Sequence, residues 1–117
     1  MKNPECFLSS LDSYQFKQKR EFEIIKQISI HSESNQKEGW VVKITPNLIG
    51  QSYGLGGEDI DYLILTPRHL GVNIYDIKKF PCFVYIIRII NNKIPTENII
   101  DSNSVEVIAW GEIYKRV

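Results

Sequence analysis

The run CFVYIIRII, residues 82–90, is the most strongly β-forming stretch of the chain. Aromatic and β-branched residues predominate in it, and such side chains fit the pleated, half-buried surface of a sheet. The alternation predicts a strand on which one face carries Phe83, Tyr85, Ile87 and Ile89. The other face carries the single charge, Arg88. We therefore expect this run to form the centre of a sheet.

The segments around this run also read as strands. Residues 61–67, DYLILTP, are apolar at both parities, which predicts a strand covered on both sides. Residues 40–46 and 21–30 alternate as strands with one buried face, although Ile25 and Lys26 interrupt the second pattern. The last segment, residues 105–117, alternates imperfectly around Gly111, where we expect a bulge or a tight bend that curls the sheet. Strand parity assigns four large aromatic side chains to the core: Trp40, Phe83, Tyr85 and Trp110.

Helical signals are few. Residues 4–20 fit either a short helix or a strand, and Thr96 with Glu97 fits the start of one helical turn. The spacing of the strands leaves no room for crossover helices. The sequence predicts a mainly β, single small domain over residues 1–117, with an antiparallel curved sheet that forms a partly open barrel or a sandwich, and at most one or two short helices.

The charge balance argues against some partners. The 14 basic and 14 acidic residues give a net charge of zero, which disfavours nucleic acid and anionic lipid. A local basic segment, Lys17 to Arg20 beside Phe16, keeps nucleic-acid binding as an alternative. No stretch reaches the length of a membrane span, and no signal peptide is recognisable at the start, so a cytoplasmic location is expected. Cys6 and Cys82 lack the partners of a zinc site, and neither a metal nor a cofactor is expected.

The stretch GQSYGLGGEDIDYLILTPRH, residues 50–69, is the clearest candidate for function. Its glycines suit a loop of unusual conformation, and long irregular loops frequently bind ligands or partners. The acidic edge of this loop suits the surface of a basic protein partner, while Arg68 and His69 lie at a strand end. The predicted interface residues are Tyr53, Glu58, Asp59, Asp61, Arg68, His69 and Tyr75.

Catalytic signatures are weak. Residues 50–54 match the letters of a nucleophile elbow, but that motif requires a strand, a helix and a large α/β scaffold. Cys82 lies in an apolar run that does not lower a thiol pKa, which argues against a thiol hydrolase. We therefore expect a non-catalytic protein that binds a protein partner, for example a toxin antagonist of the bacterial immunity-protein kind. The alternatives are a nucleic-acid-binding small barrel and a small-ligand-binding or hydrolytic domain centred on His69.

Overall fold

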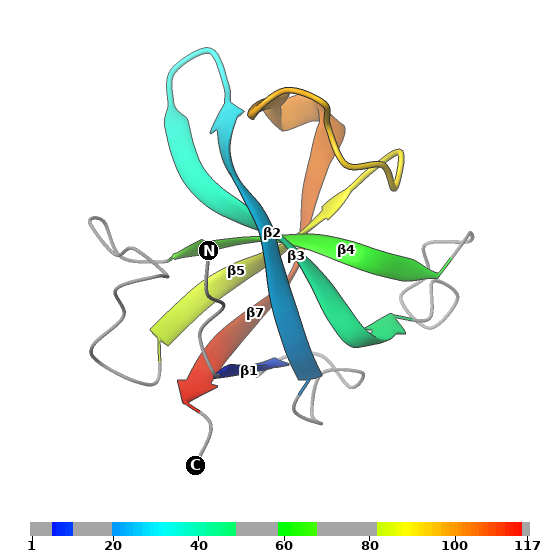
Figure 1. Cartoon of the computed structure of the whole chain (residues 1–117). Helices are drawn as coiled ribbons and strands as arrows, with labels where there is room; N and C mark the ends of the chain where they lie inside the picture. The colour runs from blue at the N-terminus through cyan, green and yellow to red at the C-terminus, as the bar shows by residue number, and fades with distance from the viewer. Residues whose placement is uncertain (1–5, 11–19, 49–58, 68–81, 116–117) are drawn as a thin grey trace.

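The fold is a single curved β-sheet. The computed structural model describes residues 6–10, 20–48, 59–67 and 82–115, and these contain seven strands (Figure 1). The strands are β1 (Cys6–Ser10), β2 (Arg20–His31), β3 (Gln36–Leu48), β4 (Ile60–Pro67), β5 (Cys82–Ile89), β6 (Ile99–Asp101) and β7 (Val105–Lys115). Within these ranges the helical structure is one 3₁₀ turn, Ser102–Ser104, capped by the side chain of Asp101. The mainly β prediction is confirmed.

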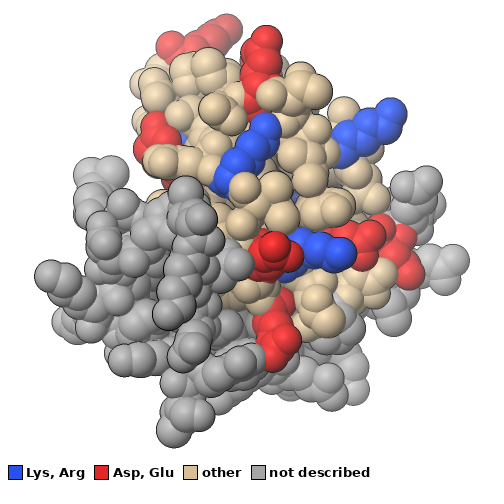
Figure 2. Space-filling view, in the orientation of Figure 1, with Lys and Arg blue, Asp and Glu red and all other residues tan. Residues whose placement is uncertain are grey.

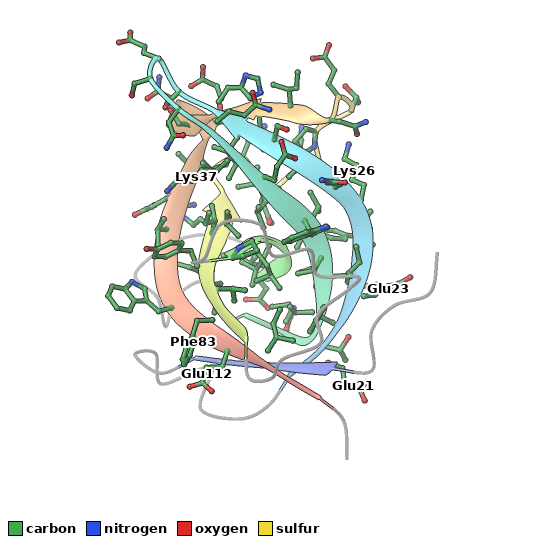
Figure 3. The ribbon with its side chains drawn as sticks, turned by 90° about the vertical axis from the view of Figure 1, so that its left-hand side faces the viewer. Glu21, Glu23, Lys26, Lys37, Phe83 and Glu112 are labelled. Atoms are coloured by element: carbon green, nitrogen blue, oxygen red, sulfur yellow. The ribbon has the colours of Figure 1, made fainter. Side chains whose placement is uncertain are left out.

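The sheet curls into a partly open barrel. Its strand order is β1-β7-β5-β4-β3-β2-β6, and β1 additionally pairs with β2. All these pairings are antiparallel except the short parallel one between β2 and β6. Strand β1 forms five residue pairs with β7 but two with β2, so the seam between β1 and β2 is short. The strands curve around a common interior in Figure 3. Of the two conformations left open for residues 4–20, the strand is the one found at Cys6–Ser10.

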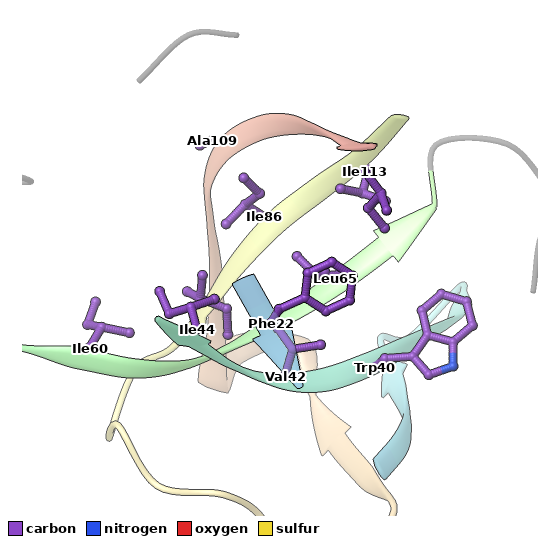
Figure 4. Close-up of a cluster of buried hydrophobic side chains, with 11 residues drawn as sticks. Phe22, Trp40, Val42, Ile44, Ile60, Leu65, Ile86, Ala109 and Ile113 are labelled. Carbon is purple, nitrogen blue, oxygen red and sulfur yellow. The ribbon is translucent and has the colours of Figure 1, made fainter. Parts of the chain in front are cut away.

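A first hydrophobic core fills the barrel. It draws buried side chains from β2, β3, β4, β5 and β7, and Figure 4 shows them converging from these strands. Leu63, Leu65 and Ile86 at its centre are fully buried. The complete set is Phe22, Trp40, Val42, Ile44, Ile60, Leu63, Leu65, Val84, Ile86, Ala109 and Ile113. The predicted core position of Trp40 is correct, since this residue is 2% exposed.

A second hydrophobic core covers the opposite face of the sheet. It consists of Ile28, Ile30, Val41, Ile64, Ile87, Ile89 and Ile100. The side chains of Ile64 and Ile87 therefore point away from the barrel interior, while their neighbours Leu65 and Ile86 point into it. This explains why residues 61–67 are apolar at both parities: β4 is buried on both faces, as predicted.

Two β-bulges allow long strands to serve both cores. In β2 the pairing with β3 shifts between Ile24 and Lys26, and in β7 the pairing with β5 shifts between Val107 and Ala109. A bulge adds one residue to one strand, so the side chains beyond it switch faces. The bulge in β7 was expected at Gly111, but Gly111 pairs regularly with Val84. The bulge lies at Ile108 instead.

The connection between β5 and β7 also differs from the prediction. The helical turn expected at Thr96 and Glu97 is absent, since these residues form a bend; the 3₁₀ turn of this connection is Ser102–Ser104, and β6, which precedes it, was not predicted. The ammonium of Lys26, placed just after the bulge in β2, donates hydrogen bonds to the backbone carbonyl oxygens of Pro95 and Glu97. A further backbone bond runs from the Ser29 N–H to the Asn98 carbonyl oxygen at 2.9 Å. These hydrogen bonds attach the connection between β5 and β7 to strand β2.

Candidate functional site

Most of the interface residues predicted from the sequence lie outside the described residues. These are Tyr53, Glu58, Arg68, His69 and Tyr75. Asp59 and Asp61 are described, and both are exposed around the start of β4. The carbonyl oxygen of Asp59 accepts a hydrogen bond from the side-chain amide of Asn92 at 3.2 Å, which links this strand to the turn after β5. The predicted acidic edge is thus solvent-accessible at its two described positions.

A different surface stands out on the outer face of the sheet. We define the aromatic surface as Lys37, Tyr85, Val107 and Trp110, contributed by β3, β5 and β7. Trp110 is 46% exposed and Val107 is 53% exposed. The rings of Tyr85 and Trp110 meet edge to face, with centroids 6.3 Å apart and planes at 88°. This arrangement is favoured by the ring quadrupoles, and it fixes the exposed indole against a half-buried ring.

The register of β5 and β7 explains why Trp110 faces outward. Trp110 pairs with Tyr85, whose ring packs on the second core, while Ala109 beside it belongs to the barrel core. Val107 pairs with Ile87 of the second core, so it faces the same side as Trp110. The prediction that Trp110 is a core residue was wrong, and Tyr85 and Phe83 are half-buried.

Lys37 adds a cation to the aromatic surface. Its ammonium nitrogen lies 5.5 Å from the centroid of the Tyr85 ring, within the range of a cation–π contact. The salt bridge between Arg88 and Glu106, with 2.9 Å between nitrogen and oxygen, does not involve Lys37. The positive charge of Lys37 therefore rests on an aromatic ring, with no described carboxylate in ion-pair distance.

Charges of both signs surround the barrel. Figure 2 shows acidic and basic side chains interspersed over the described part of one face, without a broad area of one sign. The next residue of β7 on the side of Trp110 is Glu112, which pairs in register with Phe83 and is buried, at 9% exposed. In Figure 3, Lys37 lies near the end of the β2–β3 hairpin, whereas Phe83 and Glu112 lie near β1. The exposed charge beside the two rings is therefore that of Lys37, since Glu112 is buried.

The β2–β3 hairpin carries a polar cluster. The carboxylate of Glu38 accepts hydrogen bonds from the Ser29 hydroxyl at 2.8 Å and from the side-chain amides of Gln36 at 3.2 Å and Gln27 at 3.3 Å. The Ser29 bond holds the pKa of Glu38 below its ordinary value; burial acts in the opposite direction, and the two amides and the nearby His31 lower the pKa further. These contacts link neighbouring strands and give the hairpin a structural role.

The ranges that the structure describes contain neither a metal site nor a membrane-spanning helix. No group of three His, Cys, Asp or Glu side chains lies close enough there to hold a metal ion. None of the residues in these ranges forms a helix long and apolar enough to span a membrane. Of the predicted basic segment, Arg20 alone is described, as the first residue of β2.

The signal that the sequence carried for the aromatic surface was the imperfect alternation of residues 105–117. It was assigned to Gly111, and in the structure it comes from the bulge at Ile108. The pairing of Lys37 with Tyr85 has no local signal, since the two residues lie on strands separated by β4. Comparison with protein-family models, with curated proteins and with solved structures gave no match to this chain.

Proposed function

We propose that the chain is a small protein-binding domain and that the aromatic surface is its docking face. The observation that carries this proposal is the outward-facing Trp110, 46% exposed and fixed edge-on by Tyr85. Tryptophan and tyrosine are enriched at protein interfaces and among the residues that dominate binding energy. An exposed indole on a sheet with two packed cores offers apolar area at little cost in side-chain entropy.

The specific form of this function that we propose is a cytoplasmic toxin antagonist of the immunity-protein kind. Such a protein acts by occupying its partner and performs no chemistry of its own. The exposed Asp59 and Asp61 suit the rim of such an interface, where charge mainly affects the rate of association. The candidate partner is the protein encoded in the adjacent reading frame.

Site-specific photo-crosslinking in the source cells tests the proposal. A benzoylphenylalanine at Val107 is expected to give a discrete adduct with one protein, which mass spectrometry identifies. The matched control carries the same group at Ile99, an equally exposed apolar residue (52%) on β6. The proposal fails if position 107 gives no protein adduct, or the same adducts as position 99.

Affinity measurements on the identified pair then show which residues contribute most of the binding free energy. Trp110→Ser is expected to weaken binding at least about tenfold, because truncating a central aromatic anchor commonly costs 2 kcal/mol or more, with ~1.4 kcal/mol equal to a tenfold change. Ile99→Ser should leave the affinity unchanged. A partner that inhibits growth when expressed alone, and not with this chain, would establish the toxin-antagonist form.

A further inference from the structure

We infer that the segment bound by the aromatic surface is acidic, with a carboxylate at Lys37 and an apolar or aromatic side chain on Trp110 and Val107. This inference rests on the proposed function and names the chemistry of the partner. Its basis is the exposed ammonium of Lys37, which lies over the same Tyr85 ring that contacts the exposed Trp110.

Lys37 is available for a partner carboxylate. Its ammonium has three N–H donors. The face of the Tyr85 ring, with its centroid 5.5 Å from the nitrogen, attracts the positive charge but accepts no conventional hydrogen bond from these donors. The side chain is exposed, and none of the described carboxylates forms a salt bridge with it. A carboxylate arriving there gains an ion pair without displacing an existing one.

The position of Lys37 gives the surface a direction. Lys37 lies near the end of the β2–β3 hairpin (Figure 3), and the Tyr85 ring contacts both its ammonium and the indole of Trp110. A segment with its carboxylate at Lys37 therefore places its apolar side chain over Trp110 and Val107.

The same groups argue for an acidic peptide over single-stranded nucleic acid. Nucleic acid also stacks on tryptophan, but its backbone is held by a groove of several cations. Among the four residues of the aromatic surface, Lys37 is the one cation. One ammonium cannot hold the phosphates on both sides of a base stacked on Trp110.

Peptide titration followed by ¹H–¹⁵N NMR tests this inference, because the chain has two tryptophans and therefore two indole N–H signals. The probes are the blocked peptides Asp-Glu-Phe-Asp-Glu and Lys-Lys-Phe-Lys-Lys, and oligothymidylate. The acidic peptide is expected to shift the Trp110 signal and to bind about two- to fivefold more tightly than the basic one, the range of an exposed ion pair. Trp40, 2% exposed, provides the internal reference, and Trp110→Phe assigns the signals.

Charge reversal completes the test. Lys37→Glu should invert the preference between the two peptides, whereas Lys43→Glu, an exposed lysine paired in register with Glu23, should not. Equal binding of both peptides, no shift of the Trp110 signal, or no effect of Lys37→Glu would overturn the acidic partner. Preferential binding of oligothymidylate would overturn it in favour of nucleic acid. The crosslinking at Val107 judges the proposed function independently of these results.

Discussion

The two tryptophans occupy similar strand positions but have opposite environments. Trp40 is 2% exposed in the barrel core, and Trp110 is 46% exposed on the outer face. Both rings are equally apolar, so hydrophobicity by itself assigns both to the core, which was the prediction. The register of β7 against β5 places Ala109 inside the barrel and turns Trp110 outward. Exposure of Trp110 is therefore a property of the pairing and not of the residue.

A single buried hydroxyl gives a prediction at this scale. Thr66 in β4 is 4% exposed, and its Oγ1 has no hydrogen-bond partner among the residues that the structure describes. A buried unsatisfied hydroxyl costs about 1–3 kcal/mol, and valine has nearly the same shape without it. Thr66→Val is expected to raise the free energy of unfolding by about 1 kcal/mol, measured by urea denaturation. Thr45→Val, at an exposed position of β3, is the control and should change stability by less than about 0.5 kcal/mol.

At the scale of the element, the bulges decide which core a side chain enters. In β2 the apolar residues keep one sequence parity on both sides of the bulge, yet Phe22 belongs to the barrel core and Ile28 to the second core. In β7 the same holds for Ala109 and Val105. The interruption at Ile25 and Lys26 was visible in the sequence, and the structure shows that it switches the buried face.

Deleting the bulge residue of β2 tests this role. Without Ile25, the side chains of Ile28 and Ile30 would turn away from the second core. Burial of each contributes about 1.5–3 kcal/mol, so the deletion should cost about 3–6 kcal/mol, a large part of the about 5–15 kcal/mol typical of a domain. Deletion of Ser34, in the exposed turn between β2 and β3, is the control. Equal denaturation midpoints for the two deletions would contradict the assignment.

The hairpin contacts of Glu38 give a pH dependence. Because hydrogen bonds lower its pKa in the folded chain, its stabilising contribution is present above the ordinary pKa of 4.5 and is lost as the pH falls through the lowered value. The free energy of unfolding of the wild type should therefore exceed that of Glu38→Gln near neutral pH, and the difference should shrink on acidification. The effect should be small and weaker in salt, since the carboxylate is exposed. A difference that grows below pH 4 would be inconsistent with this account.

At the scale of the whole molecule, the edges of the sheet determine whether its strands can pair with other chains. Strand β1 covers the edge of β7 along five residue pairs and reaches β2 at two more. At the other end of the sheet, β6 is three residues long and carries Asp101, and short, charged strands discourage pairing with other chains. The architecture thus leaves few strand edges open within the described ranges and directs interaction to the outer face of the sheet.

Removal of β1 tests the importance of this closure. A chain that begins at residue 11 would uncover the edge of β7 and the start of β2. Exposed edges pair readily, so this variant is expected to self-associate with increasing concentration. Size-exclusion chromatography with light scattering measures the change against the full chain. A truncated chain whose oligomeric state matches that of the full chain, with unchanged stability, would show that β1 is dispensable.

The pattern of apolar and polar residues was sufficient to predict the strands that carry a clear pattern of their own. Residues 40–46 and 82–90 were predicted as strands because their side chains alternate, and residues 61–67 because they are apolar at both parities; these segments correspond to β3, β5 and β4 respectively. Strand β6 escaped prediction because its three residues, held in parallel register with β2, are too few to show a period. The interface residues proposed around residues 50–69 stay predictions at the undescribed positions.

The sequence by itself determined that this protein is a mainly β fold with β4 buried on both sides, because alternation and β-branched side chains act locally along each strand. Tertiary structure alone decided the seam made by β1, the side of the sheet that each half of β2 and β7 faces, and the meeting of Lys37, Tyr85 and Trp110. These features depend on register between strands that are distant in sequence, and a shift of one residue moves every side chain to the other face.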